Sequence, residues 1–140
     1  APMSHAICAS PALLDACFRP KAPDDLRRLP CIIDTNFSGQ SNWRFVEDGK
    51  PVTVHVSGAV KVNSPVAAMQ AALAGLGFAI VPTYLAAPAL AAGRLEVVLA
   101  DKAPEGPSLL AVYPHRRHLA GKVRALIDHL VDWFAANPVR

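Results

Sequence analysis

A strand, a helix start and a second strand follow one another in the middle of the chain, and this order constrains the fold most. The run of residues 52–62 begins by alternating apolar and polar side chains, which predicts a half-buried strand. Asn63-Ser64-Pro65 then predicts a helix start, because a polar cap residue followed by proline suits the first helical turn. Residues 78–81 are continuously apolar, which is typical of a strand covered on both faces. Strands alternating with helices predict an α/β protein with a mostly parallel sheet.

Other segments carry similar signals and complete the predicted order of elements. Helices are predicted at residues 11–17, 65–74, 84–92 and from 121 onward, with a helical turn at 24–29. Strands are predicted at residues 5–9, 31–33, 43–46, 52–62, 78–81, 95–99 and 109–113. In the helix after Pro65, the spacing gives one apolar stripe of Val66, Met69 and Leu73. The last helix has the clearest helical periodicity, with one apolar face made of Val123, Leu126, Ile127, Leu130 and Phe134.

Composition excludes several classes of protein. Of the 140 residues, 52% are hydrophobic and 18% are charged, so the chain is predicted to be globular, not disordered. No unbroken apolar run reaches the roughly 18 residues of a membrane helix, and the start does not resemble a signal peptide. The three cysteines are too few for a disulfide scaffold, which favours a reducing compartment and a cytoplasmic location.

The net charge of +3 does not by itself indicate a nucleic-acid binder. Residues 1–70 carry seven Lys/Arg against six Asp/Glu, and residues 71–140 carry seven against five. Neither half therefore forms the basic stripe that phosphate binding needs. The local cluster His115-Arg116-Arg117-His118 is interpreted as a solvated turn in preference to a phosphate contact.

Catalytic, cofactor and metal motifs are weak. There is no Gly-x-Ser-x-Gly elbow, and Gly75-Leu76-Gly77 follows a helix and precedes a strand, the reverse of a dinucleotide-binding loop. His5 and Cys8 lack a second ligand pair, and Pro114 favours a turn over a helix that would align His115 with His118. We therefore predict no catalytic residue, no metal and no cofactor.

The cysteines and one aspartate leave some chemistry open. Cys8 and Cys17 are candidates for redox sensing, although their apolar neighbours favour inert thiols. A weaker hypothesis is an enzyme that uses Cys31 or Asp34, since no catalytic partner residue is evident for either.

Two polar helix starts are better candidates for binding a small anion. Ser10-Pro11 follows one predicted strand and Asn63-Ser64-Pro65 follows another. Free backbone amides and the helix dipole favour an anion at such a junction. Ligands of open α/β sheets bind beyond the carboxyl ends of the strands, so we expect both caps at that edge, near Thr35 and Asn36.

The order of several short motifs resembles the effector-binding domain of LysR-type transcriptional regulators. The motifs are Ser10-Pro11-Ala12-Leu13-Leu14, Pro23-Asp24-Asp25-Leu26, Cys31-Ile32-Ile33, Trp43-Arg44-Phe45, Val60-Lys61-Val62-Asn63, the run from Ala71 to Pro82, Gly93-Arg94-Leu95 and Ala111-Val112-Tyr113-Pro114-His115-Arg116-Arg117. The resemblance covers nearly the whole chain. Ala120-Gly121 departs from it, since the family often has Ser-Pro there, so the last helix has a weaker cap.

The resemblance implies a fold similar to type 2 periplasmic binding proteins, with two α/β subdomains joined by crossover strands. Residues 1–11 would form a crossover strand and the start of a helix, residues 12–109 the second subdomain, and residues 110–140 the return crossover and the last helix of the first subdomain. The winged helix-turn-helix and part of the first subdomain are not in this sequence, so DNA would be bound only through that missing domain. We further expect a homo-oligomer, dimer or tetramer, in which the last helix packs against another copy.

The resemblance also implies a function: sensing a small organic, anionic effector in the cleft between the subdomains. The residues expected to bind it are Ser10, Pro11, Thr35, Asn36, Asn63 and Ser64, with Phe78 and Val81 as an apolar wall. The alternative is a transporter's solute-binding protein, which has the same architecture.

Overall fold

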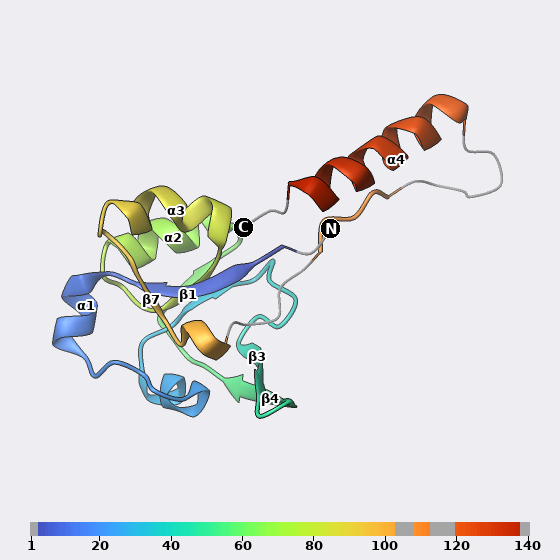
Figure 1. Cartoon of the computed structure of the whole chain (residues 1–140). Helices are drawn as coiled ribbons and strands as arrows, with labels where there is room; N and C mark the ends of the chain where they lie inside the picture. The colour runs from blue at the N-terminus through green and yellow to red at the C-terminus, as the bar shows by residue number, and fades with distance from the viewer. Residues whose placement is uncertain (1–2, 103–107, 113–119, 138–140) are drawn as a thin grey trace.

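The computed structural model describes residues 3–102, 108–112 and 120–137 (Figure 1). The strands are β1 His5–Ala9, β2 Ile32–Asp34, β3 Asn42–Glu47, β4 Lys50–His55, β5 Val60–Val62, β6 Ala79–Pro82 and β7 Glu96–Val98. The helices are α1 Pro11–Ala16, α2 Pro65–Leu73, α3 Thr83–Ala91 and α4 Gly121–Ala136, with short 3₁₀ helices η1 Pro23–Arg28 and η2 Ala100–Lys102. This order confirms an α/β protein, and most predicted elements lie within a few residues of their observed positions.

The direction of β1 corrects the prediction of a mostly parallel sheet. β1 lies between β6 and β7 and is antiparallel to both. β2 and β5 are parallel, and a parallel bridge between Cys31 and Phe78 joins β2 to β6. The crossovers from β5 through α2 to β6 and from β6 through α3 to β7 therefore join strands of one direction, as crossover geometry favours. The end of β1 and the start of β2 lie at the same edge of the sheet. Among β1, β2, β5, β6 and β7, only β1 therefore runs in the opposite direction.

Side chains of the central strands alternate between two cores, one on each face of the sheet. Ile7, Ile33 and Ile80 point into a core closed by α1, η1 and the antiparallel β3–β4 hairpin. Cys8 and Ile32 point into the other core, which α2 and α3 cover (Figure 1). Because successive side chains of a strand face opposite sides, this split follows directly from the strands being buried on both faces.

The predicted strand at residues 52–62 is interrupted and becomes β4 and β5. The predicted alternation is confirmed, since Val54 and Val56 are buried while Thr53 and His55 are exposed. At Gly58, however, the backbone approaches Cys31 so closely that an added Cβ would lie 1.5 Å from the Cys31 carbonyl oxygen. This contact redirects the chain from the hairpin into the parallel sheet.

The stripe predicted for α2 is only partly confirmed, since Met69 and Leu73 pack against a core but are not fully buried. The buried residues of α2 are Ala68 and Ala72, whereas Val66 is 49% exposed. Nearly every residue of α2 is apolar, so the periodicity does not define a face. The small alanines then face the sheet, because they let the helix approach it closely.

Three predictions concern the part of the chain after β7. Residues 109–112 lie outside any strand and are exposed, so the return crossover strand is not present over these residues. Tyr113 and the cluster at residues 115–118 lie outside the described residues. The last helix is confirmed as α4, which extends away from the sheet with no buried residue (Figure 1).

Candidate functional site

Three strands end at one edge of the sheet, here called the carboxyl edge. β2, β5 and β6 run in the same direction, so the residues that follow them lie at this edge. Thr35 and Asn36 follow β2, Asn63 and Ser64 follow β5, and Thr83 follows β6. Four of the eight residues predicted to bind a ligand are therefore brought together.

Hydrogen bonds hold the two exposed loops of this edge against each other. The backbone N–H and the hydroxyl of Thr35 both donate to the carbonyl of Val62, at 2.8 and 3.1 Å. The side-chain amide of Asn36 donates to the carbonyl of Asn63. The backbone N–H of Asn36 donates to the buried Asp34 carboxylate at 2.9 Å. These bonds fix the backbone, and they leave the side chain of Asn63 exposed.

The N-terminus of α2 at this edge has free capacity for hydrogen bonds. Ser64 is the N-cap, but its side chain makes no capping bond to the helix. Pro65 has no N–H, and the first intrahelical bond runs from Ala68 to the Ser64 carbonyl at 2.9 Å. The amides of Val66 and Ala67 therefore have no intrahelical acceptor, and the helix dipole adds partial positive charge there.

The structure adds two residues at this edge, Thr83 and His5, that the sequence reasoning did not place there. Thr83 begins α3, and both its N–H and its hydroxyl donate to the carbonyl of Ser4, at 3.0 and 3.1 Å. His5 is only 6% exposed, and its ring lies 5.7 Å from the Phe37 ring. Burial lowers the pKa of His5, and its hydrogen bond with the Met3 carbonyl only partly opposes that effect. The sequence could have indicated Thr83 as a residue of this edge, because it lies between the apolar run at residues 78–81 and the helix predicted at residues 84–92.

Ser10 and Pro11 lie at the opposite edge, so the expectation that both caps share one edge is wrong. β1 is antiparallel to β6, with His5 opposite Pro82 and Cys8 opposite Ala79. The end of β1 therefore lies where β6 begins. Ser10 caps α1 as predicted, its hydroxyl accepting from the Leu13 N–H at 3.3 Å. Around Ser10 and Pro11 is a separate cavity of about 420 Å³, lined by Ala12, Leu73, Ala74, Gly75 and Arg94 as well.

Phe78 and Val81 are not at the surface of either edge. Both have no exposed surface, and they belong to the two cores on opposite faces of the sheet. Neither lines the carboxyl edge. Their apolar character reflects burial in the sheet, which a continuous apolar run predicts equally well.

The described residues offer little for redox or metal chemistry. Burial raises the pKa of the Cys8 and Cys31 thiols to about 12, which disfavours the reactive thiolate. Cys17 is partly buried, and it packs against the core. Within residues 3–102, 108–112 and 120–137, no group of three His, Cys, Asp or Glu side chains is placed to hold a metal. None of the helices in this described part is long and apolar enough to cross a membrane.

Open α/β sheets commonly bind ligands at the edge where parallel strands end, and comparison with known proteins specifies the family of this chain. The model of the LysR substrate binding domain family matches residues 2–135. The chain therefore belongs to the LysR substrate-binding family, and it is an effector-binding regulatory domain of the LysR type, a non-enzymatic family.

Curated relatives agree with this family. The chain is 30% identical over 134 residues to the probable HTH-type transcriptional regulator LtrA of Klebsiella pneumoniae, covering 94% of this chain and 43% of LtrA. It is 32% identical over 91 residues to a putative LysR family substrate binding domain-containing protein, YagP, of Escherichia coli, covering 65% of this chain and 67% of YagP. The chain spans about two-fifths of the length of the first regulators it matches.

Solved structures support the fold. Full-length AphB of Vibrio cholerae, a virulence activator, superposes with a TM-score of 0.72 at 21% identity, covering 95% of this chain and 46% of AphB. The regulatory domain of CrgA from Neisseria meningitidis gives a TM-score of 0.68 at 20% identity, covering 94% of this chain and 65% of that domain. Identification as a regulator also favours the first predicted function over a solute-binding protein of a transporter.

Proposed function

We propose that the carboxyl edge forms one wall of the effector site, and that a small organic anion binds there to Asn63 and Ser64, while Thr35 and Asn36 line the edge and hold its two loops together. In this proposal the domain acts in the cytoplasm as the sensor of a LysR-type regulator that binds DNA through another domain. The observation that carries it is the uncapped start of α2 beside the exposed Asn63 side chain. Helix amides of this kind favour an anion.

Residue chemistry supports a carboxylate-bearing ligand. The amides of Val66 and Ala67 supply two backbone donors, and the Ser64 hydroxyl and the Asn63 amide add side-chain donors next to them. Each is free of the bonds that hold the loops together, because the loop contacts use the Asn63 carbonyl and the Thr35 and Asn36 side chains. The buried Asp34 carboxylate is bonded by the Asn36 N–H, which lessens its repulsion of an anion.

Signal transmission would follow from a difference in affinity between two arrangements of the domain. An effector shifts a conformational equilibrium only as far as it binds one state better than the other. The carboxyl edge suits this role, since β1 enters the sheet at the same edge through His5 and the Thr83–Ser4 contacts. A ligand held at this edge would lie near the start of β1.

The site is tested with the double variant Asn63→Ala/Ser64→Ala in the full regulator that contains this chain. Neither side chain makes a hydrogen bond that holds the described fold, so folding should be retained. We expect loss of the effector response of a reporter gene, with Gln70→Ala on the exposed side of the same helix as the matched control. A full response in the double variant would contradict the site.

A direct measurement uses the 140-residue chain itself. We expect a panel of small carboxylates and aromatic acids to shift the amide NMR signals of Val66 and Ala67 before any others. Shifts confined to residues around Ser10 and Arg94 would instead place the anion at the opposite edge.

A further inference from the structure

A carboxylate is buried at the carboxyl edge without a positively charged partner. Asp34 is the last residue of β2, and it is only 9% exposed. Its Oδ1 atom accepts the backbone N–H of Asn36 at 2.9 Å, whereas its Oδ2 atom has no hydrogen-bond partner among the described residues. No cationic side chain of the described chain forms an ion pair with it. Because a buried charge is costly unless it is paired, Asp34 indicates a positive group that this part of the chain does not supply.

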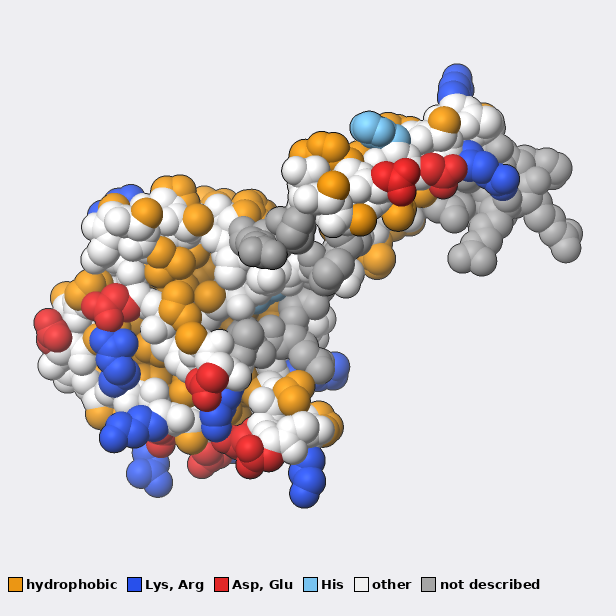
Figure 2. Space-filling model, viewed as in Figure 1, with side chains coloured by type: hydrophobic (Ala, Val, Ile, Leu, Met, Phe, Trp, Pro, Cys, Tyr) orange, Lys and Arg blue, Asp and Glu red, His pale blue; other side chains and the backbone are white. Residues whose placement is uncertain are grey.

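The acids that do form ion pairs lie in a different environment. Figure 2 shows Lys and Arg side chains on the surface of the body, several of them next to Asp or Glu side chains. The ion pairs are Arg19–Glu96, Arg27–Asp24 and Lys102–Glu47. All three acids of these pairs are partly or largely exposed to solvent, so Asp34 differs from them both in its burial and in its lack of a cation.

The topology of the sheet places Asp34 beside the first turn of α2. Successive side chains of a strand alternate between its faces, and Ile32 points into the core that α2 and α3 cover, so Asp34 points to the same side. β2 lies between β5 and β6, and α2 connects these two strands, so α2 crosses β2 on that side. The helix begins at the carboxyl edge, where β2 ends. The carboxylate of Asp34 and the start of α2 therefore share one face and one edge of the sheet.

The free oxygen of Asp34 is open to solvent. In the described part of the chain, every buried side-chain oxygen or nitrogen that is sealed from solvent has a hydrogen-bond partner. Oδ2 of Asp34 has no such partner, so it is not sealed. A small positively charged group from solution can therefore reach the same atom that water reaches.

Two features of opposite charge preference thus meet at the carboxyl edge. The amides of Val66 and Ala67 have no intrahelical acceptor and favour a carboxylate, whereas Asp34 favours a cation. A ligand with a carboxylate alone would satisfy the amides, but Asp34 would repel it and would stay unpaired. A ligand with a carboxylate and an ammonium group close together would satisfy both features.

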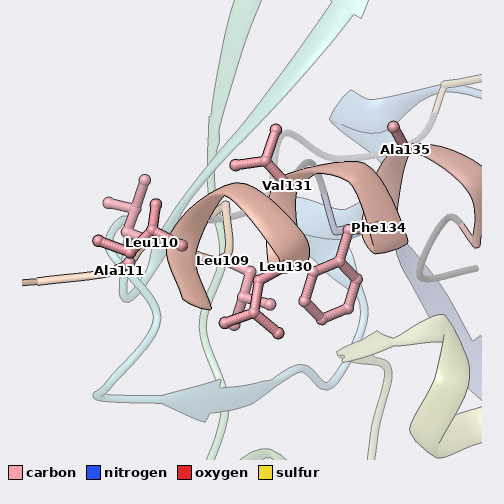
Figure 3. A pocket seen from close by; sticks show the side chains of 8 residues that line it. Leu109, Leu110, Ala111, Leu130, Val131, Phe134 and Ala135 are labelled. Atoms are coloured by element: carbon pink, nitrogen blue, oxygen red, sulfur yellow. The ribbon is translucent and has the colours of Figure 1, made fainter. Parts of the chain in front are cut away.

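The two other hollows in the described structure lack this combination. The groove along α4 has a volume of about 460 Å³ and is lined by apolar side chains alone (Figure 3). The cavity beside Ser10 contains the guanidinium of Arg94, but no carboxylate lines it. Neither hollow offers partners for both ends of a zwitterion.

We propose that the effector is an amino acid, whose carboxylate binds the amides of Val66 and Ala67 and whose ammonium group donates to Oδ2 of Asp34. This inference rests on the effector site proposed above and narrows its ligand from an organic anion to a zwitterion. Asn63 and Ser64 keep their role as side-chain donors to the carboxylate. Asp34 determines specificity, because it favours amino acids and disfavours carboxylates that have no cationic group.

The proposal is tested first on the unaltered 140-residue chain by amide NMR. The twenty standard L-amino acids are titrated singly, and we expect at least one to shift the signals of Val66 and Ala67. Analogues of that amino acid that lack only the amino group, or only the carboxylate, are then titrated. We expect either loss to weaken binding about tenfold or more, since each removes a hydrogen bond between charged groups or to a charged group.

The variant Asp34→Asn then tests the role of the carboxylate. Asparagine keeps an oxygen for the Asn36 N–H and removes the charge. We expect the amino acid to bind about tenfold or more weakly, and the analogue without the amino group to bind as tightly as before or more tightly. Asp48→Asn, in the exposed turn between β3 and β4, removes the same charge and should change either dissociation constant less than about threefold. Circular dichroism checks that both variants fold.

The outcomes separate this inference from the effector site on which it rests. Carboxylates that shift Val66 and Ala67 equally well with and without an amino group would overturn the amino-acid ligand and leave the effector site intact. If none of the compounds shifts these two amides, the effector site fails, and the amino-acid ligand fails with it. A preference for the amino group that persists in folded Asp34→Asn would show that Asp34 does not bind the ammonium.

Discussion

The body of the protein, residues 3–102, and α4 differ in how their apolar residues are used. In the body, Trp43, Phe45 and Phe78 are at most 2% exposed, and two cores fill both faces of the sheet. α4 has the clearest helical periodicity in the sequence, yet no residue of it is buried. Periodicity therefore predicts which face of a helix is apolar, but it does not predict which surface covers that face. The predictions below test whether stability resides in the body alone.

The largest difference is expected between Phe45→Ala and Leu126→Ala. Phe45 has no exposed surface, so its truncation should lower the free energy of unfolding by about 3–5 kcal/mol. Leu126 is 57% exposed, and its truncation should change the value by less than about 0.5 kcal/mol in dilute, monomeric samples. Urea unfolding followed by circular dichroism measures both. Equal losses would mean that α4 is part of the folded core.

Two glycines give a second matched pair. Gly58→Ala should destabilise the body by about 1–3 kcal/mol, because its new Cβ meets the Cys31 carbonyl. Gly121 begins α4 with nothing within 4 Å of an added Cβ, so Gly121→Ala should be neutral or stabilise α4 by less than about 1 kcal/mol. Thermal unfolding of both variants checks this pair. A neutral Gly58→Ala would show that β4 and β5 separate for another reason.

The smallest effect concerns pH and the buried His5. Burial lowers the pKa of His5 below its ordinary value of 6.5, so the unfolded chain binds this proton more readily than the folded chain. The contribution of His5 to stability is therefore complete above pH 6.5 and decreases as the pH falls from there towards the lower folded pKa. We expect His5→Gln to flatten the stability profile below pH 6.5. Unfolding midpoints measured between pH 5 and 8 test the difference.

Local signals in the sequence predicted much of the fold. Ser10 caps α1, and Gly75 and Gly93 adopt positive φ after α2 and α3. The hairpin with Asp48-Gly49 and the helix from Gly121 also lie where the sequence indicates. Each of these features depends on residues that are near one another in the chain, so the local sequence pattern is sufficient to predict it.

The candidate site was only half predictable. Parallel strands end at the same edge of a sheet, whichever strands pair with one another. This rule brings together Thr35, Asn36, Asn63 and Ser64. The expectation that Ser10 shares this edge failed because strand direction is set by pairing with residues more than 70 positions away. The contact of Thr83 with Ser4 is of the same long-range kind.

The sequence by itself determined the types of the elements, their caps and the family, because these follow from short-range sterics and from ordered motifs. Tertiary structure decided the reversal of β1, the division of alternate side chains between two cores and the exposure of α4. Those outcomes depend on which surfaces meet, and a pattern of apolar residues is compatible with more than one partner.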